Sequence, residues 1–321
     1  MIRVVNLGDN TERIIQTEEV KSIGLSNVWL ELIDPIENEL QAVSEITQLP
    51  INFLRLPQTD GYVNLRLEEG FGIINFLVLQ DIVSTKKAYP IVMGFSKNFL
   101  VTITKKEIQT IINTAKERMS KTRVDPPSQV TYFIIDEIVA NHYLQIEKLE
   151  NLTAKMEEEV VEKTSPDTLK KIFKLKSNMI SFNKILWYER GLVFNLKKCD
   201  RNCIDARARA LFDTTHEELT RQVDIVETYR EILSDAINVH LSAISNKINL
   251  SIKGLTVVIF YLTIVTTVTS FPNTVATFFG ISQFGNTNII IISIAILISI
   301  VLPFIWLWRK RWLTSKKLDS A

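Results

Sequence analysis

Hydroxyl and amide side chains recur along one face of a long apolar stretch near the end of the sequence. They return at intervals of three and four residues, which is the period of one helix face packed against a supercoiled neighbour. The residues between them are mostly apolar. Polar groups at membrane depth face protein or water and avoid lipid. The polar residues of this face are Asn249, Thr256, Thr263, Thr266, Ser270, Asn273 and Thr277, with Gly280 at its end and Ser282 after it, and the same spacing also includes Ile252 and Ile259.

Two interpretations of this polar face are open. Serine and threonine hydroxyls can bond back to the carbonyls of their own helix or join two helices, and this explains any single threonine well. A polar face that lasts the whole span favours a water-filled pore lined by several copies of the helix, because a contact between two helices needs only a few polar points. One pair of helices cannot enclose a pore, so the second interpretation requires a homo-oligomer.

Two apolar runs surround this face and extend beyond it. Residues 253–281 and 288–308 each reach the roughly 20 residues that a helix needs to cross a bilayer. A short loop, 282–287, separates them, and a basic tail, 309–321, follows. Arg309, Lys310 and Arg311 favour the cytoplasmic side, as do Lys247 and Lys253 before the first run. The first residues do not resemble a signal peptide. We therefore expect a multi-pass protein of the cell membrane with both termini in the cytoplasm.

The rest of the chain reads as a soluble α/β domain followed by a helical stalk. Of the 321 residues, 46% are hydrophobic and 23% charged, and the net charge of +1 gives no reason to expect a nucleic-acid partner. Residues 1–125 form the predicted cytoplasmic α/β domain and residues 126–252 the stalk. The fold class is thus an α+β membrane protein. The predicted strands are 2–6, 28–33, 62–67, 72–79, 91–94 and 99–104, with a helix at 35–47.

Three long helices are predicted after the strands. The first covers 129–164, and Ser165 caps the second, which runs to about residue 199. The third begins near Asp205 and continues without a break into the first apolar run, because no proline interrupts residues 205–271. The first transmembrane helix is therefore predicted to be a direct continuation of the stalk.

The sequence shows no constellation typical of an enzyme. It lacks a glycine-rich phosphate loop, a nucleophile elbow and a paired-histidine metal motif. Cys199 and Cys203 lie four residues apart without further metal ligands nearby, and we interpret them as reduced thiols. We therefore expect no catalytic residues and no cofactor.

The junction between stalk and membrane resembles that of the CorA family of divalent-cation transporters. Its residues are Ser245-Asn246-Lys247-Ile248-Asn249, then Lys253, Leu255 and Thr256. The resemblance covers nearly the whole chain. It implies a homopentamer with a cytoplasmic funnel, a pore lined by the first transmembrane helix, and a divalent cation, Mg²⁺ above all, as the transported ion. Other similar features are Trp29 with Asp34-Pro35, Asn98-Phe99-Leu100-Val101-Thr102, and Asp136-Glu137-Ile138.

The chain departs from this family at the outer end of the pore. The family signature there is Tyr-Gly-Met-Asn, whereas this chain has Phe279-Gly280-Ile281-Ser282. The hydroxyl of Ser282 can bond to coordinated water but lacks an amide fork. Asn273, two turns before Gly280 on the polar face, is our candidate for the missing amide ring. Selectivity for Zn²⁺ or Co²⁺, or passage of monovalent ions, therefore stays open beside Mg²⁺.

The resemblance also implies regulation by divalent ions that bridge carboxylates of neighbouring cytoplasmic domains. Asp213 and Glu217 lie near the start of the last helix, where such acidic residues are expected, although the sequence by itself favours a solvated helix face as their explanation. A different function also fits the two apolar runs. They can serve only as an anchor for a sensor or scaffold, but an anchor has no use for polar residues at every turn.

Overall fold

The computed structural model describes most of the chain before residue 279. The described residues are 1–9, 11–56, 63–81, 88–120, 126–162, 165–199, 204–278 and the single positions 290, 293, 294, 297, 298, 301 and 305. The chain separates into two compact units, Met1–Leu241 and Ser242–Ala321. The predicted loop 282–287, most of the second apolar run and the basic tail 309–321 lie outside the described residues.

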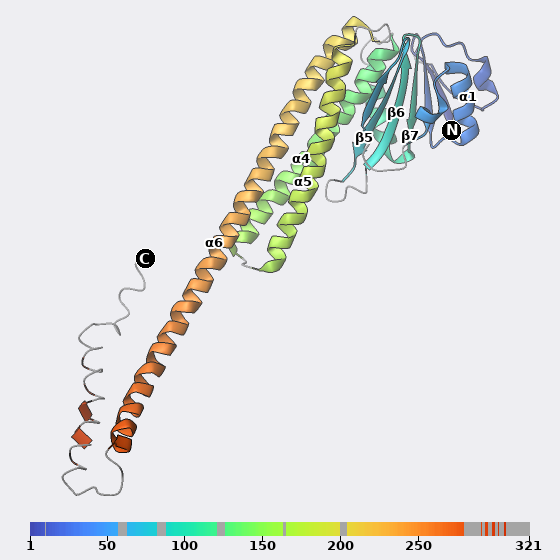
Figure 1. The fold of residues 1–321 in the computed structure, drawn as a ribbon. Helices are drawn as coiled ribbons and strands as arrows, with labels where there is room; N and C mark the ends of the chain where they lie inside the picture. Colours follow the sequence, from blue (N-terminus) through green and yellow to red (C-terminus); the bar gives the residue numbers. More distant parts are fainter. Residues whose placement is uncertain are drawn as a thin grey trace. The chain divides into compact units, whose positions relative to one another are not determined.

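A seven-stranded mixed sheet forms the N-terminal part of the first unit (Figure 1). The strand order is β2-β1-β3-β7-β6-β5-β4. The neighbours β3 and β7 run parallel, and the other pairs are antiparallel. The strands are β1 Ile2–Asn6, β2 Thr11–Ile15, β3 Val28–Ile33, β4 Asn64–Leu67, β5 Phe71–Leu79, β6 Ala88–Ser96 and β7 Phe99–Thr104.

Three of these strands have the predicted bounds, namely β1, β3 and β7. The predicted strands at 72–79 and 91–94 are confirmed in place, but β5 begins one residue earlier and β6 extends at both ends. The edge strand β2 was not predicted. Four of its five residues are exposed and only Ile15 is buried, so its sequence lacks the alternation that marks a half-buried strand.

Both faces of the sheet are covered by helices. One face packs against α1 (Glu37–Thr47) and α2 (Ile51–Leu54), and its core includes Leu30. The other face packs against α3 (Gln109–Ser120) and α4 (Pro127–Glu162), and its core includes Trp29. Successive residues of β3 therefore fill opposite cores, as the two-residue period of a strand requires.

Two further long helices follow α4. Helix α5 spans Pro166–Lys197, and the predicted cap is confirmed because the Oγ of Ser165 accepts a hydrogen bond from the backbone N–H of Thr168 at 3.3 Å. Helix α6 spans Ala206–Phe278, a single helix of 73 residues that includes the stalk and the first apolar run. The Oδ1 of Asp205 caps it by accepting from the N–H of Ala208 at 2.7 Å.

Candidate functional site

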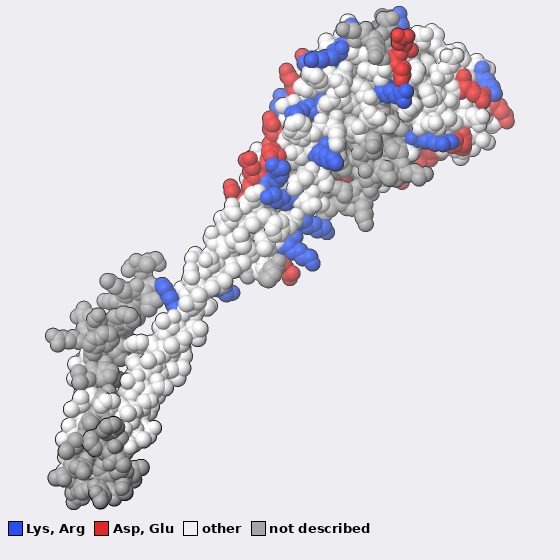
Figure 2. Space-filling model, viewed as in Figure 1, with Lys and Arg blue, Asp and Glu red and all other residues white. Residues whose placement is uncertain are grey.

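No residue in the most apolar part of α6 is buried within the single chain. This segment is long and apolar enough to cross a membrane. Large side chains such as Leu255 and Leu262 are more than half exposed. Figure 2 shows this end of α6 in white, without the blue and red side chains that cover the helices nearer the sheet. So much exposed apolar surface requires a cover from outside the chain, either lipid or further copies.

The predicted polar face lies on this segment. Seven of the eight residues from Asn249 to Gly280 that were assigned to it are described, and every one of the seven is exposed. Gly280 and Ser282 lie outside the described residues, so the geometry of the outer end rests on the sequence. The seven residues are Asn249, Thr256, Thr263, Thr266, Ser270, Asn273 and Thr277.

The threonine hydroxyls of this face donate to carbonyls of their own helix. The Oγ1 atoms of Thr256 and Thr263 donate to the carbonyl oxygens four residues earlier at 2.8 Å each, and that of Thr277 does so at 2.7 Å. Thr269, outside the polar face, makes the same bond at 2.9 Å. Back-bonding is therefore general along α6 and does not by itself identify a pore face.

Back-bonding nevertheless fixes what these hydroxyls offer to a neighbour. Each hydroxyl has one proton, which it donates in a hydrogen bond to the helix carbonyl. The lone pairs of the hydroxyl oxygen therefore remain available on the outer side of the helix. A row of such oxygens accepts hydrogen bonds but cannot donate them. The water molecules around a cation turn their hydrogens outward, whereas those around an anion turn their oxygens outward. The threonine row therefore matches the hydration shell of a cation and not that of an anion.

The two predicted regulatory carboxylates, Asp213 and Glu217, differ in their contacts within the chain. The side chain of Asp213 forms an ion pair with the Nζ of Lys197 on α5, whereas Glu217 is exposed on the next turn of α6. Within the described part of the chain, no group of three or more His, Cys, Asp or Glu side chains is positioned to hold a metal ion. A bridging ion at Glu217 would therefore need ligands from another chain.

A carboxylate cluster that the sequence analysis used only for its resemblance joins three helices. The Nη2 of Arg118 on α3 lies 2.6 Å from the Oδ2 of Asp136 on α4, and its Nη1 lies 2.9 Å from the Oε2 of Glu137. The Oγ1 of Thr215 on α6 donates to the other oxygen of Asp136 at 3.2 Å. Burial and the charge of Asp136 raise the pKa of the neighbouring Glu218. The cluster connects α3, α4 and α6.

A second polar group that sequence reasoning missed lies inside the bundle of α4, α5 and α6. His142 and Glu189 are both fully buried, and the Nδ1 of His142 lies 3.2 Å from the Oε1 of Gln222. Burial lowers the pKa of His142 to about 4 and raises that of Glu189 well above its usual value. No periodicity could have revealed this group, because it depends on the rotation of three separate helices.

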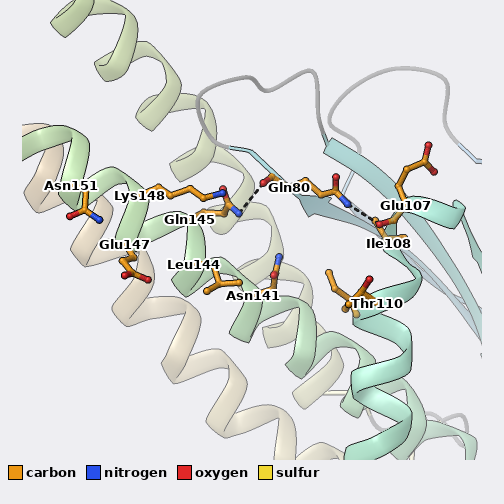
Figure 3. Close-up of a pocket in the computed structure, with 11 residues that line it drawn as sticks. Gln80, Glu107, Ile108, Thr110, Asn141, Leu144, Gln145, Glu147, Lys148 and Asn151 are labelled. Carbon is orange, nitrogen blue, oxygen red and sulfur yellow. Dashed lines mark hydrogen bonds between the residues drawn. The ribbon is translucent and has the colours of Figure 1, made fainter.

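A hollow of about 570 Å³ lies between α4 and the end of the sheet (Figure 3). Two of the amides in it are occupied by protein contacts. The Nε2 of Gln80 donates to the carbonyl of Glu107 at 2.8 Å, and the Nε2 of Gln145 donates to the carbonyl of Gln80 at 3.1 Å. These bonds hold the α4 face against the segment before α3. Leu144 and Glu147 lie on the α4 side of the hollow.

The two cysteines do not form a described site. Cys199 is a buried free thiol, and Cys203 lies outside the described residues.

Comparison with known proteins agrees with this arrangement. The family profile described as CorA-like Mg²⁺ transporter protein matches residues 25–311. The cobalt/magnesium transport protein CorA of Methanocaldococcus jannaschii is 22% identical over 298 residues, which cover 88% of this chain and 90% of that protein. The corresponding protein of Thermotoga maritima is 30% identical over 127 residues, which are 40% of this chain and 36% of that protein.

Solved structures show the same fold. The complete structure of the CorA magnesium transporter from Methanocaldococcus jannaschii superposes with a TM-score of 0.72 at 18% identity, covering 96% of this chain and 97% of that one. The full-length CmaX protein superposes with a TM-score of 0.67 at 14% identity, covering 97% of each chain. The mixed sheet, the long helices and the apolar part of α6 are thus features shared with a membrane transporter, and no enzyme activity is implied. The chain belongs to the family of CorA-like Mg²⁺ transporter proteins.

Proposed function

We propose that this protein is a channel for divalent cations, with Mg²⁺ as the expected ion, formed by five copies of the chain around the polar face of α6. The observation that carries the proposal is the row of exposed hydroxyl and amide side chains along an otherwise apolar helix, interrupted on that face by Ile252 and Ile259. Both termini lie on the cytoplasmic side in this proposal. The second apolar run surrounds the pore helices and faces lipid.

The chemistry of the row supports passage of a hydrated ion. Mg²⁺ gives up its water shell reluctantly, so neutral oxygens that accept from that shell are better suited to it than a tight ligand cage. Five copies of Asn273 would add a ring of amides, which can both accept and donate. The membrane field drives entry, at about 2.3 kcal/mol per elementary charge for each 100 mV.

Ion flux into liposomes that contain the purified protein tests the proposal. We expect uptake of Mg²⁺ under an inside-negative potential and no uptake of chloride. A panel with Zn²⁺, Co²⁺ and Na⁺ determines the selectivity. Asn273→Ala should reduce the discrimination between these ions. Absence of flux for every ion would contradict the channel and leave a membrane-anchored sensor or scaffold.

Regulation by a divalent ion is the second part of the proposal. Glu217 is exposed and can share an ion with a neighbouring chain, whereas Asp213 already pairs with Lys197. We expect chelation to raise flux in the native protein and to have a smaller effect in Glu217→Ala. Asp213→Ala should retain more of the native increase in flux on chelation than Glu217→Ala does. Identical responses of all three proteins to chelation would rule out these carboxylates as the regulatory ligands.

A further inference from the structure

Helix α5 exposes large apolar side chains at every seventh residue. Trp187 is 55% exposed, Phe173 53%, Ile180 49% and Phe194 38%. The positions between them on the same face, Ser177, Lys184 and Gly191, are exposed as well. A seven-residue apolar repeat is the pattern of a helix that packs lengthwise against another helix. Nothing among the described residues of the same chain covers this face, which we call the α5 row.

The charges beside the α5 row are almost all positive. Its exposed charged neighbours are Lys170, Lys171 and Lys174, with Asp167 as the one acidic residue, in the first turn. Arg190 stacks over the ring of Trp187 at 4.0 Å, and the Nζ of Lys184 lies 5.8 Å from the ring centre of Tyr188. Two α5 rows would therefore repel each other. The partner of this face must combine apolar surface with negative charge.

Helix α4 carries a face with those properties. Tyr143, Glu147, Glu150, Ala154 and Glu157 follow one another at intervals of four and three residues, and all five are exposed. Leu144, beside Tyr143, is 57% exposed and borders the hollow of Figure 3. We call this face the α4 row. It is acidic and offers two apolar side chains at one end.

We propose that the α5 row of one copy packs on the α4 row of a second copy of this chain. The two surfaces differ, so the contact is head-to-tail. A head-to-tail contact closes into a ring when repetition of its rotation completes a full turn without translation, as the proposed pore requires. The proposal names the surface that holds neighbouring subunits together and deepens the pore proposal, which requires a ring but does not say which faces form it.

Contacts within one chain fix the heights of the two rows relative to each other. The Nζ of Lys171 lies 2.7 Å from the Oε1 of Glu159, and the Nε2 of His142 lies 3.5 Å from the Oε2 of Glu189. Because α4 and α5 run in opposite directions, these pairs define matching levels along both helices. Rotation about an axis parallel to the helices leaves every level unchanged.

The levels place complementary residues opposite each other in the ring. Lys184 is level with Glu147, and Lys174 with Glu157, so each cross-copy pair has opposite charges. Trp187 comes level with Leu144, which gives its large ring an apolar partner. Ser177 is level with Ala154, and both are small and exposed. The α4 row was chosen for its acidic character, but the levels come from the Lys171–Glu159 and His142–Glu189 contacts alone, so the residue-by-residue register is a separate observation.

Disulfide formation between differently tagged copies of the full chain tests this contact. One copy carries Ser177→Cys and the other Ala154→Cys, both with Cys199→Ala and Cys203→Ser. We expect a product that contains both tags. Gly191→Cys with Ala154→Cys is the matched control, because Gly191 lies about 21 Å further along α5 at 1.5 Å per residue. It should give no product. Ser177→Cys in both copies should give none either.

Charge reversal provides the second measurement. Lys184→Glu alone and Glu147→Lys alone should each lower the yield of the mixed disulfide by about fivefold, the effect of roughly 1 kcal/mol at an exposed pair. Both reversals together should restore it, and Lys155→Glu, an exposed reversal on α4 outside the row, should leave it unchanged. A product from two Ser177→Cys copies, or no mixed product from an oligomer confirmed by native mass spectrometry, would overturn the proposal. Cross-linking without ion flux would instead reject the channel and leave this contact standing.

Discussion

The Nε2 atom of His142 lies 3.5 Å from the Oε2 of Glu189, with both side chains fully buried between three helices. The Nε2 of Gln222 donates to the carbonyl of Val139 at 2.9 Å, which leaves the Oε1 of Gln222 to accept from the Nδ1–H of His142. The Nε2 of the neutral imidazole is then an acceptor that faces Glu189. A protonated Glu189 carboxyl can donate to it, and the pair is then uncharged, as its burial requires.

This pair predicts a decline of stability with rising pH. Burial raises the pKa of Glu189, so the native state holds a proton that the unfolded chain releases above its usual pKa of about 4.5. The contribution of Glu189 to the free energy of unfolding therefore decreases as pH rises. His142, with its pKa lowered to about 4, acts in the opposite direction, but only below its unfolded pKa near 6.5. Above pH 6.5 the Glu189 effect stands alone.

Glu189→Gln removes the titration and retains a donor for His142. We expect the free energy of unfolding of the native protein to fall between pH 6.5 and 8.5 relative to this variant, by up to about 1.4 kcal/mol per pH unit. Urea unfolding of the detergent-solubilised protein, followed by circular dichroism at several pH values, measures it. Parallel pH profiles of the two proteins would show that Glu189 is already ionised in the native state.

The buried hydrogen bond from Trp29 to Thr102 predicts that a nearly isosteric substitution of Thr102 destabilises the fold. Its Nε1–H donates to the Oγ1 of Thr102 at 2.9 Å, and both side chains are fully buried. Thr102→Val leaves the indole N–H without an acceptor, and we expect a loss of about 1–3 kcal/mol in the free energy of unfolding. In a Trp29→Phe background the same change should cost much less. An equal cost in both backgrounds would assign the effect to packing.

The guanidinium of Arg118 should stabilise the junction of α3 and α4. Arg118→Ala leaves Asp136 and Glu137 next to each other without their shared cation, and we expect a loss of about 1–3 kcal/mol in the free energy of unfolding. Arg118→Lys keeps one charge without the fork and should lose less. Arg221→Ala, at an exposed site on α6, is the control and should have little effect. Equal losses for Arg118→Ala and Arg221→Ala would contradict the role of the cluster.

The acceptor row of α6 predicts a position-dependent effect on transport. Thr263→Val removes one outward oxygen from the row in every copy, and we expect lower Mg²⁺ flux, whereas Thr263→Ser should retain most of it. Thr269 makes the same bond to its own helix but lies beside the row. Thr269→Val should therefore leave flux nearly unchanged. Equal inhibition at Thr263 and Thr269 in the liposome assay would show that helix stability, not the row, controls the flux.

Much of the fold could be predicted because local patterns determine it. The buried strands β3 and β7 are rich in β-branched and aromatic residues, and their predicted bounds matched the structure. Ser165 and Asp205 cap their helices as side chains of this type do. Strand β2 was not predicted because its mostly exposed residues show no alternation of apolar and polar side chains. Its position is determined by pairing with β1.

The candidate site was predictable only in part. The polar row follows from helix period alone, which the sequence contains directly. The Arg118 and Glu189 clusters depend on which faces of separate helices meet, and this is decided by packing over the whole bundle. Trp187 and Phe173 would have been read as core residues from their types, yet they are exposed. Their heptad spacing was visible in the sequence, but only the structure showed that no part of the described chain covers them.

The threonines of α6 satisfy their hydroxyl protons within one turn of the same helix. A roll of this helix about its own long axis would therefore break none of these bonds. Such a rotation would turn the threonine oxygens of the polar face away from the pore axis of the proposed oligomer. Val257 and Ile264 would then face the axis in their place. In the proposed pore, the back-bonds of these threonines would therefore not resist the exchange of a polar lining for an apolar one, and the resistance would come from side-chain packing and from hydrogen bonds between α6 and α4, such as that of Thr215 to Asp136.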